Sequence, residues 1–103
     1  MSFNALFIAH SADADKTKHG SLIQTGTYKL FTVVVKNQEE ALEVCKDTVN
    51  EEHIDAVLLC PGFTHADIAG IVKAAGDNVS VSVARGDGPS NMIAQAARKR
   101  EGL

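Results

Sequence analysis

Two short segments of the 103-residue chain contain most of the side chains that could react with a ligand or bind it. The first is Cys-Pro-Gly-Phe-Thr-His over residues 60–65, and the second is Arg-Gly-Asp-Gly-Pro over residues 85–89. A thiol beside an imidazole can form a nucleophile with its base. A guanidinium binds carboxylates and phosphates through paired hydrogen bonds, and neighbouring glycines let the backbone approach a ligand closely.

The first segment suggests a catalytic thiol. In this hypothesis Cys60 is the nucleophile, and His65 or His10 is the acid or base that activates it. A helix that begins just after Cys60 would favour the thiolate form. The competing interpretation is that Cys60 ends a buried strand and is a small core residue, as unpaired cysteines often are. The sequence leaves both interpretations open.

The two segments together suggest a site for a small anion, such as a carboxylate or a phosphate. Backbone N–H groups at the start of a helix favour an anion, and an arginine adds charge-assisted hydrogen bonds. The residues expected to contact this ligand are Gly62, Thr64, Arg85, Gly86, Asp87 and Gly88. The competing interpretation is that the second segment only forms a turn before a helix. Neither the G-x-G-x-x-G pattern nor the P-loop pattern is present.

A metal-dependent protein is a third and weaker hypothesis. His10, Cys60 and His65 are side chains that zinc or another transition metal accepts, and Asp13 or Asp87 could join them. No short spacing of the kind found in metal-binding motifs connects these residues. We therefore assign no metal ligand, and the sequence does not identify any cofactor.

Four apolar runs predict the strands that would position these side chains. They cover residues 3–9, 30–35, 56–60 and 79–84. The first three are almost continuously apolar or rich in β-branched residues, which is typical of strands covered on both faces. The fourth alternates valine with serine, which suits an edge strand with one less buried face, or a strand whose serines pack under a helix.

Helical patterns follow three of these runs. Asn37 is predicted to cap the first helix and Thr64 the second, which Gly76 would end. Pro89 is predicted to lie at the start of the third helix.

The segment between the first two runs, residues 11–28, has little periodicity. We favour a short helix that Asp15 caps, that extends through Ile23 and that Gly26 ends, and the alternative is a loop.

Strands that alternate with helices predict an α/β fold. We expect a single small domain over residues 1–103, with a four-stranded, mainly parallel sheet and helices on both faces, resembling a fragment of a flavodoxin-like or Rossmann-like fold. The expected strand order is 2-1-3-4. The alternative is an α+β sandwich in which the first two runs pair antiparallel. In a parallel sheet the strands end at one edge, so the residues that follow them should gather there.

The composition narrows the classes of partner. The net charge is −3, with 45% hydrophobic and 22% charged residues, which indicates a globular protein without the basic surface that nucleic acid requires. No apolar run is long enough to cross a membrane, and no signal peptide is recognisable at the N-terminus. Two cysteines do not make a disulfide framework. We therefore expect a cytoplasmic protein with no nucleic-acid or membrane partner.

A homo-oligomer, most simply a dimer, is also expected. An open four-stranded sheet has two edges, and residues 79–84 could pair with the same strand of a second copy. This makes a non-catalytic assembly or regulatory module the main alternative to a small-molecule binding protein or small enzyme.

Four stretches of the sequence also resemble a known family. They are Phe-Ile-Ala-His at 7–10, Lys-Leu-Phe-Thr-Val-Val-Val at 29–35, Cys-Pro-Gly-Phe-Thr-His at 60–65 and Val-Ala-Arg-Gly-Asp-Gly-Pro at 83–89. Together they are similar to a family of small microbial proteins, a domain of unknown function. The resemblance covers nearly the whole chain and implies no activity, substrate or cofactor.

Overall fold

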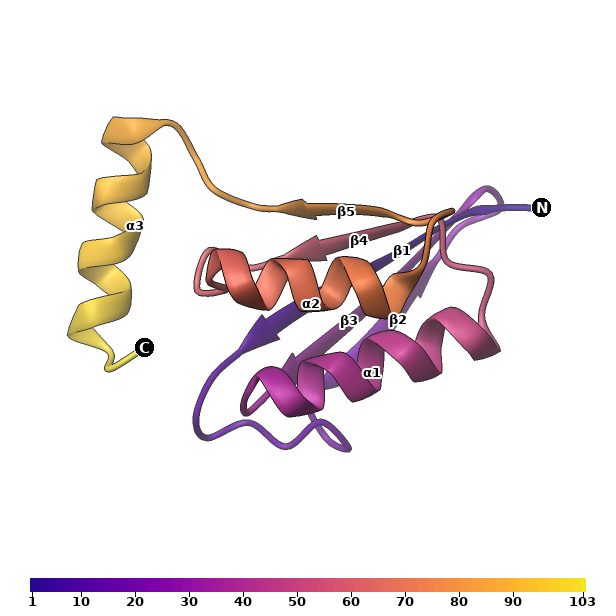
Figure 1. Ribbon diagram of the computed structural model, residues 1–103, viewed down its shortest axis with the longest axis horizontal. Coiled ribbons are helices and arrows are strands. Elements are labelled where there is room, and N and C mark those ends of the chain that lie inside the picture. Colours follow the sequence, from indigo (N-terminus) through magenta and orange to yellow (C-terminus); the bar gives the residue numbers. More distant parts are fainter.

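Five strands form one mixed sheet in the computed structural model, which describes residues 1–103 (Figure 1). The strands are β1 (Phe3–His10), β2 (Gly20–Gln24), β3 (Tyr28–Val35), β4 (Ala56–Leu59) and β5 (Ser80–Val83). Their order across the sheet is β2-β3-β1-β4-β5; β2 is antiparallel to β3, and the other neighbours are parallel. The helices are α1 (Gln38–Glu51), α2 (His65–Ala75) and α3 (Gly88–Arg100).

The four strands predicted from apolar runs are all present, and the predicted order 2-1-3-4 is confirmed as β3-β1-β4-β5. The α/β class is likewise confirmed. The sheet has a fifth strand and is mixed, where four mainly parallel strands were expected. The antiparallel alternative is wrong, because β1 and β3 pair in parallel along all eight residues.

The helix predicted between Asp15 and Ile23 is wrong. Asp15 instead begins a turn, in which its carboxylate accepts a hydrogen bond of 3.0 Å from the backbone N–H of Thr17. The following residues form β2, the antiparallel edge strand. All five residues of β2 are exposed, so the strand has no buried face to impose an alternating pattern on the sequence.

The helices α1 and α2 lie side by side over one face of the sheet, and the core fills the space between these two layers (Figure 1). On β1, Leu6 and Ile8 face the helices and are fully buried. The other large side chains of this core are Phe63, Leu59, Ile71, Val35, Val57 and Cys45. The main core cluster thus lies on the helix side of the sheet, and Ala5 is the one fully buried residue on the other face.

The prediction of helices on both faces is wrong. Connections between parallel strands are right-handed, and the chain passes in the same direction across the sheet from β3 to β4 and from β4 to β5. Both crossover helices therefore lie on the same face. The connection from β1 to β3 passes in the opposite direction, but it contains the strand β2 and no helix.

The third helix, α3, covers neither face of the sheet. It stands beyond the carboxyl ends of the parallel strands, and none of its residues is buried (Figure 1). None of the three helices combines the length and apolar character that a membrane span requires.

The predicted helix caps are confirmed. The side chain of Asn37 accepts a hydrogen bond of 3.0 Å from the backbone N–H of Glu40 at the start of α1. Thr64 and Asp67 form a reciprocal capping box at the start of α2, in which each side chain accepts a hydrogen bond of 3.1 Å from the other residue's backbone N–H. Gly76 ends α2 with a φ of +90°, a conformation that glycine adopts without strain.

The capping box predicts a specific loss of stability. Replacing Thr64 with alanine leaves the backbone N–H of Asp67 without its acceptor, so Thr64→Ala should lower the free energy of unfolding by about 1 kcal/mol. Thr64→Ser keeps the hydroxyl and should retain most of that stability. Urea unfolding followed by circular dichroism measures both variants. Equal stability of Thr64→Ala and the wild type would show that the cap contributes nothing.

Candidate functional site

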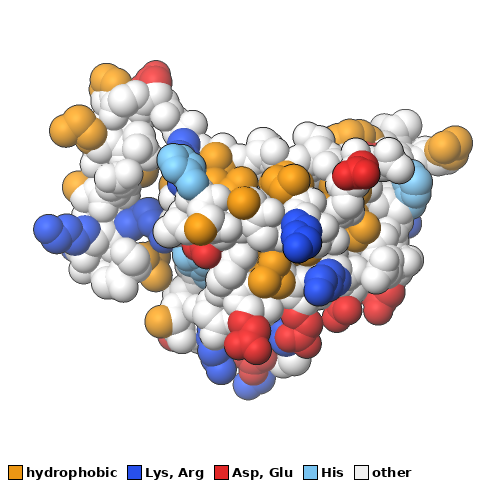
Figure 2. Space-filling view, viewed as in Figure 1, with side chains coloured by type: hydrophobic (Ala, Val, Ile, Leu, Met, Phe, Trp, Pro, Cys, Tyr) orange, Lys and Arg blue, Asp and Glu red, His pale blue; other side chains and the backbone are white.

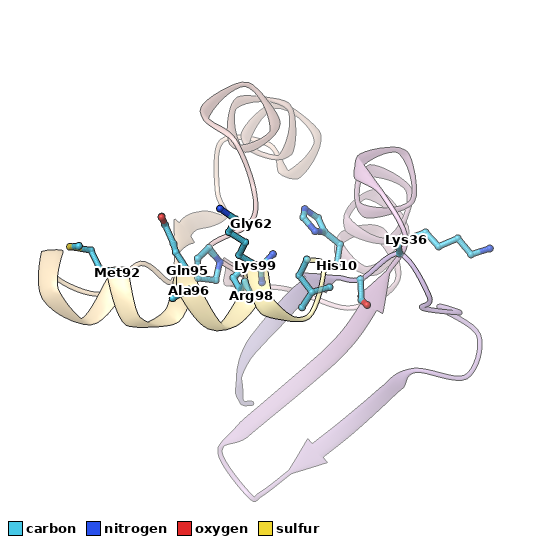
Figure 3. A pocket seen from close by; sticks show the side chains of 13 residues that line it. His10, Lys36, Gly62, Met92, Gln95, Ala96, Arg98 and Lys99 are labelled. Carbon is cyan, nitrogen blue, oxygen red and sulfur yellow. The ribbon is translucent and has the colours of Figure 1, made fainter.

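A cavity of about 740 Å³ lies between the carboxyl edge of the sheet and α3 (Figure 3). In the space-filling view it opens at the indentation between α3 and the rest of the molecule (Figure 2). The last residue of β1 and residues after β1, β3 and β4 line one side, and residues of α3 and the segment after it line the other. The lining residues are His10, Ser11, Ala12, Lys36, Pro61, Gly62, Met92, Gln95, Ala96, Arg98, Lys99, Gly102 and Leu103.

Two of the residues predicted from the sequence, His10 and Gly62, line this cavity. The imidazole of His10 packs on the ring of Phe63, with 4.4 Å between the ring centroids. Gly62 is in close contact with α3. A Cβ atom at this position would overlap the guanidinium of Arg98 and lie 3.0 Å from Cε1 of His10. The absence of a side chain at residue 62 therefore allows Arg98 to approach the loop after β4.

The structure also brings His65 and Arg85 together, outside the cavity lining. Nη1 of Arg85 lies 3.2 Å from Nε2 of His65, and Nη2 donates a hydrogen bond of 2.5 Å to the backbone carbonyl of Phe63. The guanidinium therefore links the segment after β5 to the segment after β4. These contacts give Arg85 a structural role and use part of its hydrogen-bonding capacity.

The remaining predicted ligand contacts lie at helix starts. The hydroxyl of Thr64 accepts from Asp67 within the capping box. Asp87 caps α3, where its carboxylate accepts a hydrogen bond of 3.2 Å from the backbone N–H of Ser90. Gly86 and Gly88 flank Asp87, and a Cβ atom at Gly88 would meet no other atom within 4 Å. The second segment thus forms the turn into α3, and none of these residues lines the cavity.

The thiol of Cys60 lies in the core. The residue is only 4% exposed, and its sulfur makes no hydrogen bond to His10 or His65. Cys45 is also buried, and burial raises the pKa of its thiol. The structure therefore favours the interpretation of Cys60 as a core residue.

The ligands considered for a metal site are not gathered. Nowhere in the chain do three histidine, cysteine, aspartate or glutamate side chains come together in a group that could hold a metal ion. His10 faces the cavity, whereas His65 contacts Arg85 and Cys60 is buried.

Sequence reasoning missed the cations of the cavity. Arg98 and Lys99 come from the last turn of α3, and Lys36 follows β3. Basic residues near the end of a helix interact favourably with its dipole. This interaction accounts for Arg98 and Lys99 without any ligand, so their residue types alone do not predict a binding site. Met92, Gln95 and Lys99 lie on one side of α3, and that side faces the cavity. Their spacing in the sequence shows that they share a side but does not show what that side faces.

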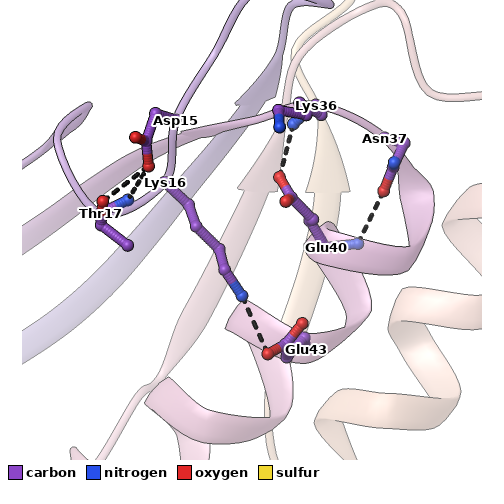
Figure 4. A network of polar contacts seen from close by, with 7 residues as sticks. All are labelled: Asp15, Lys16, Thr17, Lys36, Asn37, Glu40 and Glu43. Atoms are coloured by element: carbon purple, nitrogen blue, oxygen red, sulfur yellow. Dashed lines mark hydrogen bonds and ion pairs between the residues drawn. The ribbon is translucent and has the colours of Figure 1, made fainter.

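A network of polar contacts fixes the rim of the cavity near Lys36 (Figure 4). The backbone N–H of Lys36 donates a hydrogen bond of 2.9 Å to the carboxylate of Glu40 on α1. Lys16, in the loop after β1, lies 2.9 Å from the carboxylate of Glu43 on the same helix. That hydrogen bond raises the pKa of Lys16. The loop after β1 and the end of β3 are thus both attached to α1.

The buried thiols predict slow chemical labelling. In the native protein, Cys45 and Cys60 should react with DTNB more slowly than in the unfolded chain, by on the order of a hundredfold or more, because labelling requires the core to open. Absorbance of the released thiolate at mildly alkaline pH measures both rates. Rapid reaction of one thiol that disappears in Cys60→Ser would restore the hypothesis of a reactive cysteine.

Comparison with known proteins places the chain in a family. The model of a family of unknown function, DUF6506, matches residues 3–99, from the start of β1 to the last turn of α3. No curated protein and no solved structure matches the chain. The matched region includes both loop segments and all the strands that border the cavity. The resemblance seen in the sequence is therefore confirmed, and the chain belongs to the DUF6506 family, a family of unknown function.

Proposed function

We propose that this protein binds a small anionic ligand in the cavity between the carboxyl edge of the sheet and α3. The supporting observation is the charge of the lining. Lys36, Arg98 and Lys99 line the cavity, and no aspartate or glutamate side chain does. A cleft whose lining side chains include cations and no carboxylate has a positive potential, which attracts a carboxylate or a phosphate.

Arg98 is the residue best suited to hold the anion. The residue is half-buried, and its guanidinium makes no hydrogen bond or ion pair within the chain. A guanidinium offers five N–H donors in a fixed plane, which match the paired oxygens of a carboxylate or phosphate. Gly62 leaves room for this side chain against the loop after β4.

The other cations have different positions. Lys99 lies one residue further along α3, whereas the side chain of Lys36 extends away from α3 at the opposite end of the cavity (Figure 3). We infer that Arg98 and Lys99 act on the same end of a ligand. Lys36 contributes mainly to the potential at the entrance.

The size of the cavity is appropriate for a metabolite. Small-molecule sites in proteins typically enclose about 300–1,000 Å³, and this cavity encloses about 740 Å³. Met92 and Ala96 give the wall formed by α3 an apolar part. A ligand with a carboxylate or phosphate at one end and a carbon skeleton at the other would fit this lining.

The proposal changes the residues that the sequence suggested. Arg98 takes the role first assigned to Arg85, which is bonded to the carbonyl of Phe63. His10 is the imidazole that lines the cavity, so it is the side chain placed to exchange a proton with a bound ligand. Cys60 has no part in the binding proposal.

A panel of anions tests the role of Arg98. Inorganic pyrophosphate and citrate are suitable probes, and a probe at 100 times its Kd adds about 2.7 kcal/mol to the stability of the native state. The melting temperature of the wild type should therefore rise with at least one of these probes. Arg98→Gln should remove most of the rise. Arg100→Gln is the matched control, because Arg100 does not line the cavity and pairs with Glu101. Equal shifts in both variants would contradict the proposal.

A substitution at Gly62 tests the close approach of Arg98 independently. In Gly62→Ala the new methyl group would displace the flexible end of Arg98, so the Kd for the active probe should rise by about tenfold, or 1.4 kcal/mol. The melting temperature without probe should change little, because a side chain can move aside. Gly88→Ala is the control, since a Cβ atom there meets open space. Isothermal titration calorimetry measures the affinities, and unchanged binding in Gly62→Ala would rule out this role for the loop.

A further inference from the structure

The face of the sheet opposite α1 and α2 is largely apolar and has no helix over it, and neighbouring side chains fully bury only Ala5 on it. Leu6 and Ile8 of β1 face the helices, and successive residues of a strand alternate between faces, so Phe7 faces the opposite way. The pairing register gives the other members of this open face, which are Phe3, Ala5, Ala9, Ser21, Ile23, Tyr28, Leu30, Thr32, Val34, Ala56, Leu58, Ser80 and Ser82. None of these residues is charged. Sheets with parallel strands are almost always covered on both faces, so this one lacks a layer.

The helix α3 is the second surface without a partner. Met92, Gln95 and Lys99 face the cavity, whereas Ile93 and Ala97, which are four residues apart, share a different side of the helix with Arg100, which pairs with Glu101 at its C-terminal end. The side chain of Ile93 is 74% exposed. A helix that packs extensively on no other helix or strand, and that exposes an isoleucine, gains stability when a partner buries that side chain.

The accessible surface of the chain is larger than a monomer of its size should have. The structure exposes 6510 Å², whereas the scaling for folded monomers gives about 5,600 Å² for 10.9 kDa. The excess is about 900 Å² per chain. A stable protein–protein interface typically buries about 800 Å² on each partner. The excess surface area of the isolated chain is therefore about the area that one dimer interface would bury on it.

We propose that a second copy of this chain covers the open face, with α3 of each copy packed on the sheet of the other. The same chain presents both an uncharged sheet face and a helix side with an exposed isoleucine, so two copies related by a two-fold axis satisfy both surfaces at once. The lengths agree, because the 13 residues of α3 extend about 20 Å, and the five strands of the sheet, at a spacing of about 4.8 Å, span about 19 Å. This interface differs from the edge pairing through residues 79–84 that the sequence suggested.

The dimer and the ligand site use different sides of α3. The cavity side carries Arg98 and Lys99, and the outward side carries Ile93 and Ala97. The dimer proposal therefore stands or fails independently of the anion. A variant that loses the dimer but still binds the anion, or one that remains a dimer but no longer binds the anion, would show that the two properties are independent.

Sedimentation equilibrium of the full chain tests the proposal. The wild type should have twice the monomer mass of 10.9 kDa. Ile23→Lys, on the open face, and Ile93→Lys, on α3, should each weaken the dimer by about tenfold or more, because a buried unpaired charge opposes association. These side chains are 59% and 74% exposed in the isolated chain, so both variants should fold. Circular dichroism verifies this, and Phe3→Lys is a second open-face variant.

Two matched controls separate this interface from any other. Leu22→Lys changes the neighbouring residue of β2, which faces the helix side, and Val72→Lys changes α2. These side chains are 49% and 48% exposed, and both variants should remain dimers. A monomeric wild type would overturn the proposal, as would dimers that persist in the open-face variants. If Ile23→Lys loses the dimer but Ile93→Lys keeps it, the packing of α3 on the sheet of the other copy would be ruled out.

Discussion

The right-handed connection between parallel strands is the constraint on which the rest of this structure depends. The chain crosses the sheet in one direction from β3 through β4 to β5, so α1 and α2 must share a face. That shared face holds the core, from Leu6 on β1 to Ile71 on α2. The opposite face receives no crossover helix, because the only connection that runs the other way forms the edge strand β2. The uncovered face is thus a direct consequence of the topology.

The position of α3 connects the two proposals. Standing beyond the strand ends, it closes a cavity whose charged lining side chains are all basic, and it leaves its outward side without a partner. A helix held only by its linker and by one wall of a cavity would gain stability from packing on a second copy. The acidic residues of α1 lie along a different edge of the molecule, so the net negative charge coexists with a basic cavity (Figure 2).

Several residues that looked chemically active are used to build the fold. Thr64 and Asp87 cap helices, Cys60 fills the core, and Arg85 joins two loops. This outcome has a physical reason. Strand ends in a parallel sheet lead directly into helices, and helix starts require hydroxyls, carboxylates and glycines to satisfy backbone groups. The same residue types therefore serve turn geometry and ligand binding, and only the distances between them distinguish the two uses.

The sequence by itself determined the α/β class, the four parallel strands with their order, and the caps at Asn37, Thr64 and Gly76, because apolar runs and capping residues act over a few neighbouring positions. It also carried the resemblance to the family. Only the tertiary structure decided that β2 is a strand, that one sheet face is open, and that Arg98 rather than Arg85 faces a cavity. These features depend on which distant segments meet, and exposed residues such as those of β2 and α3 bear no local pattern that records their neighbours.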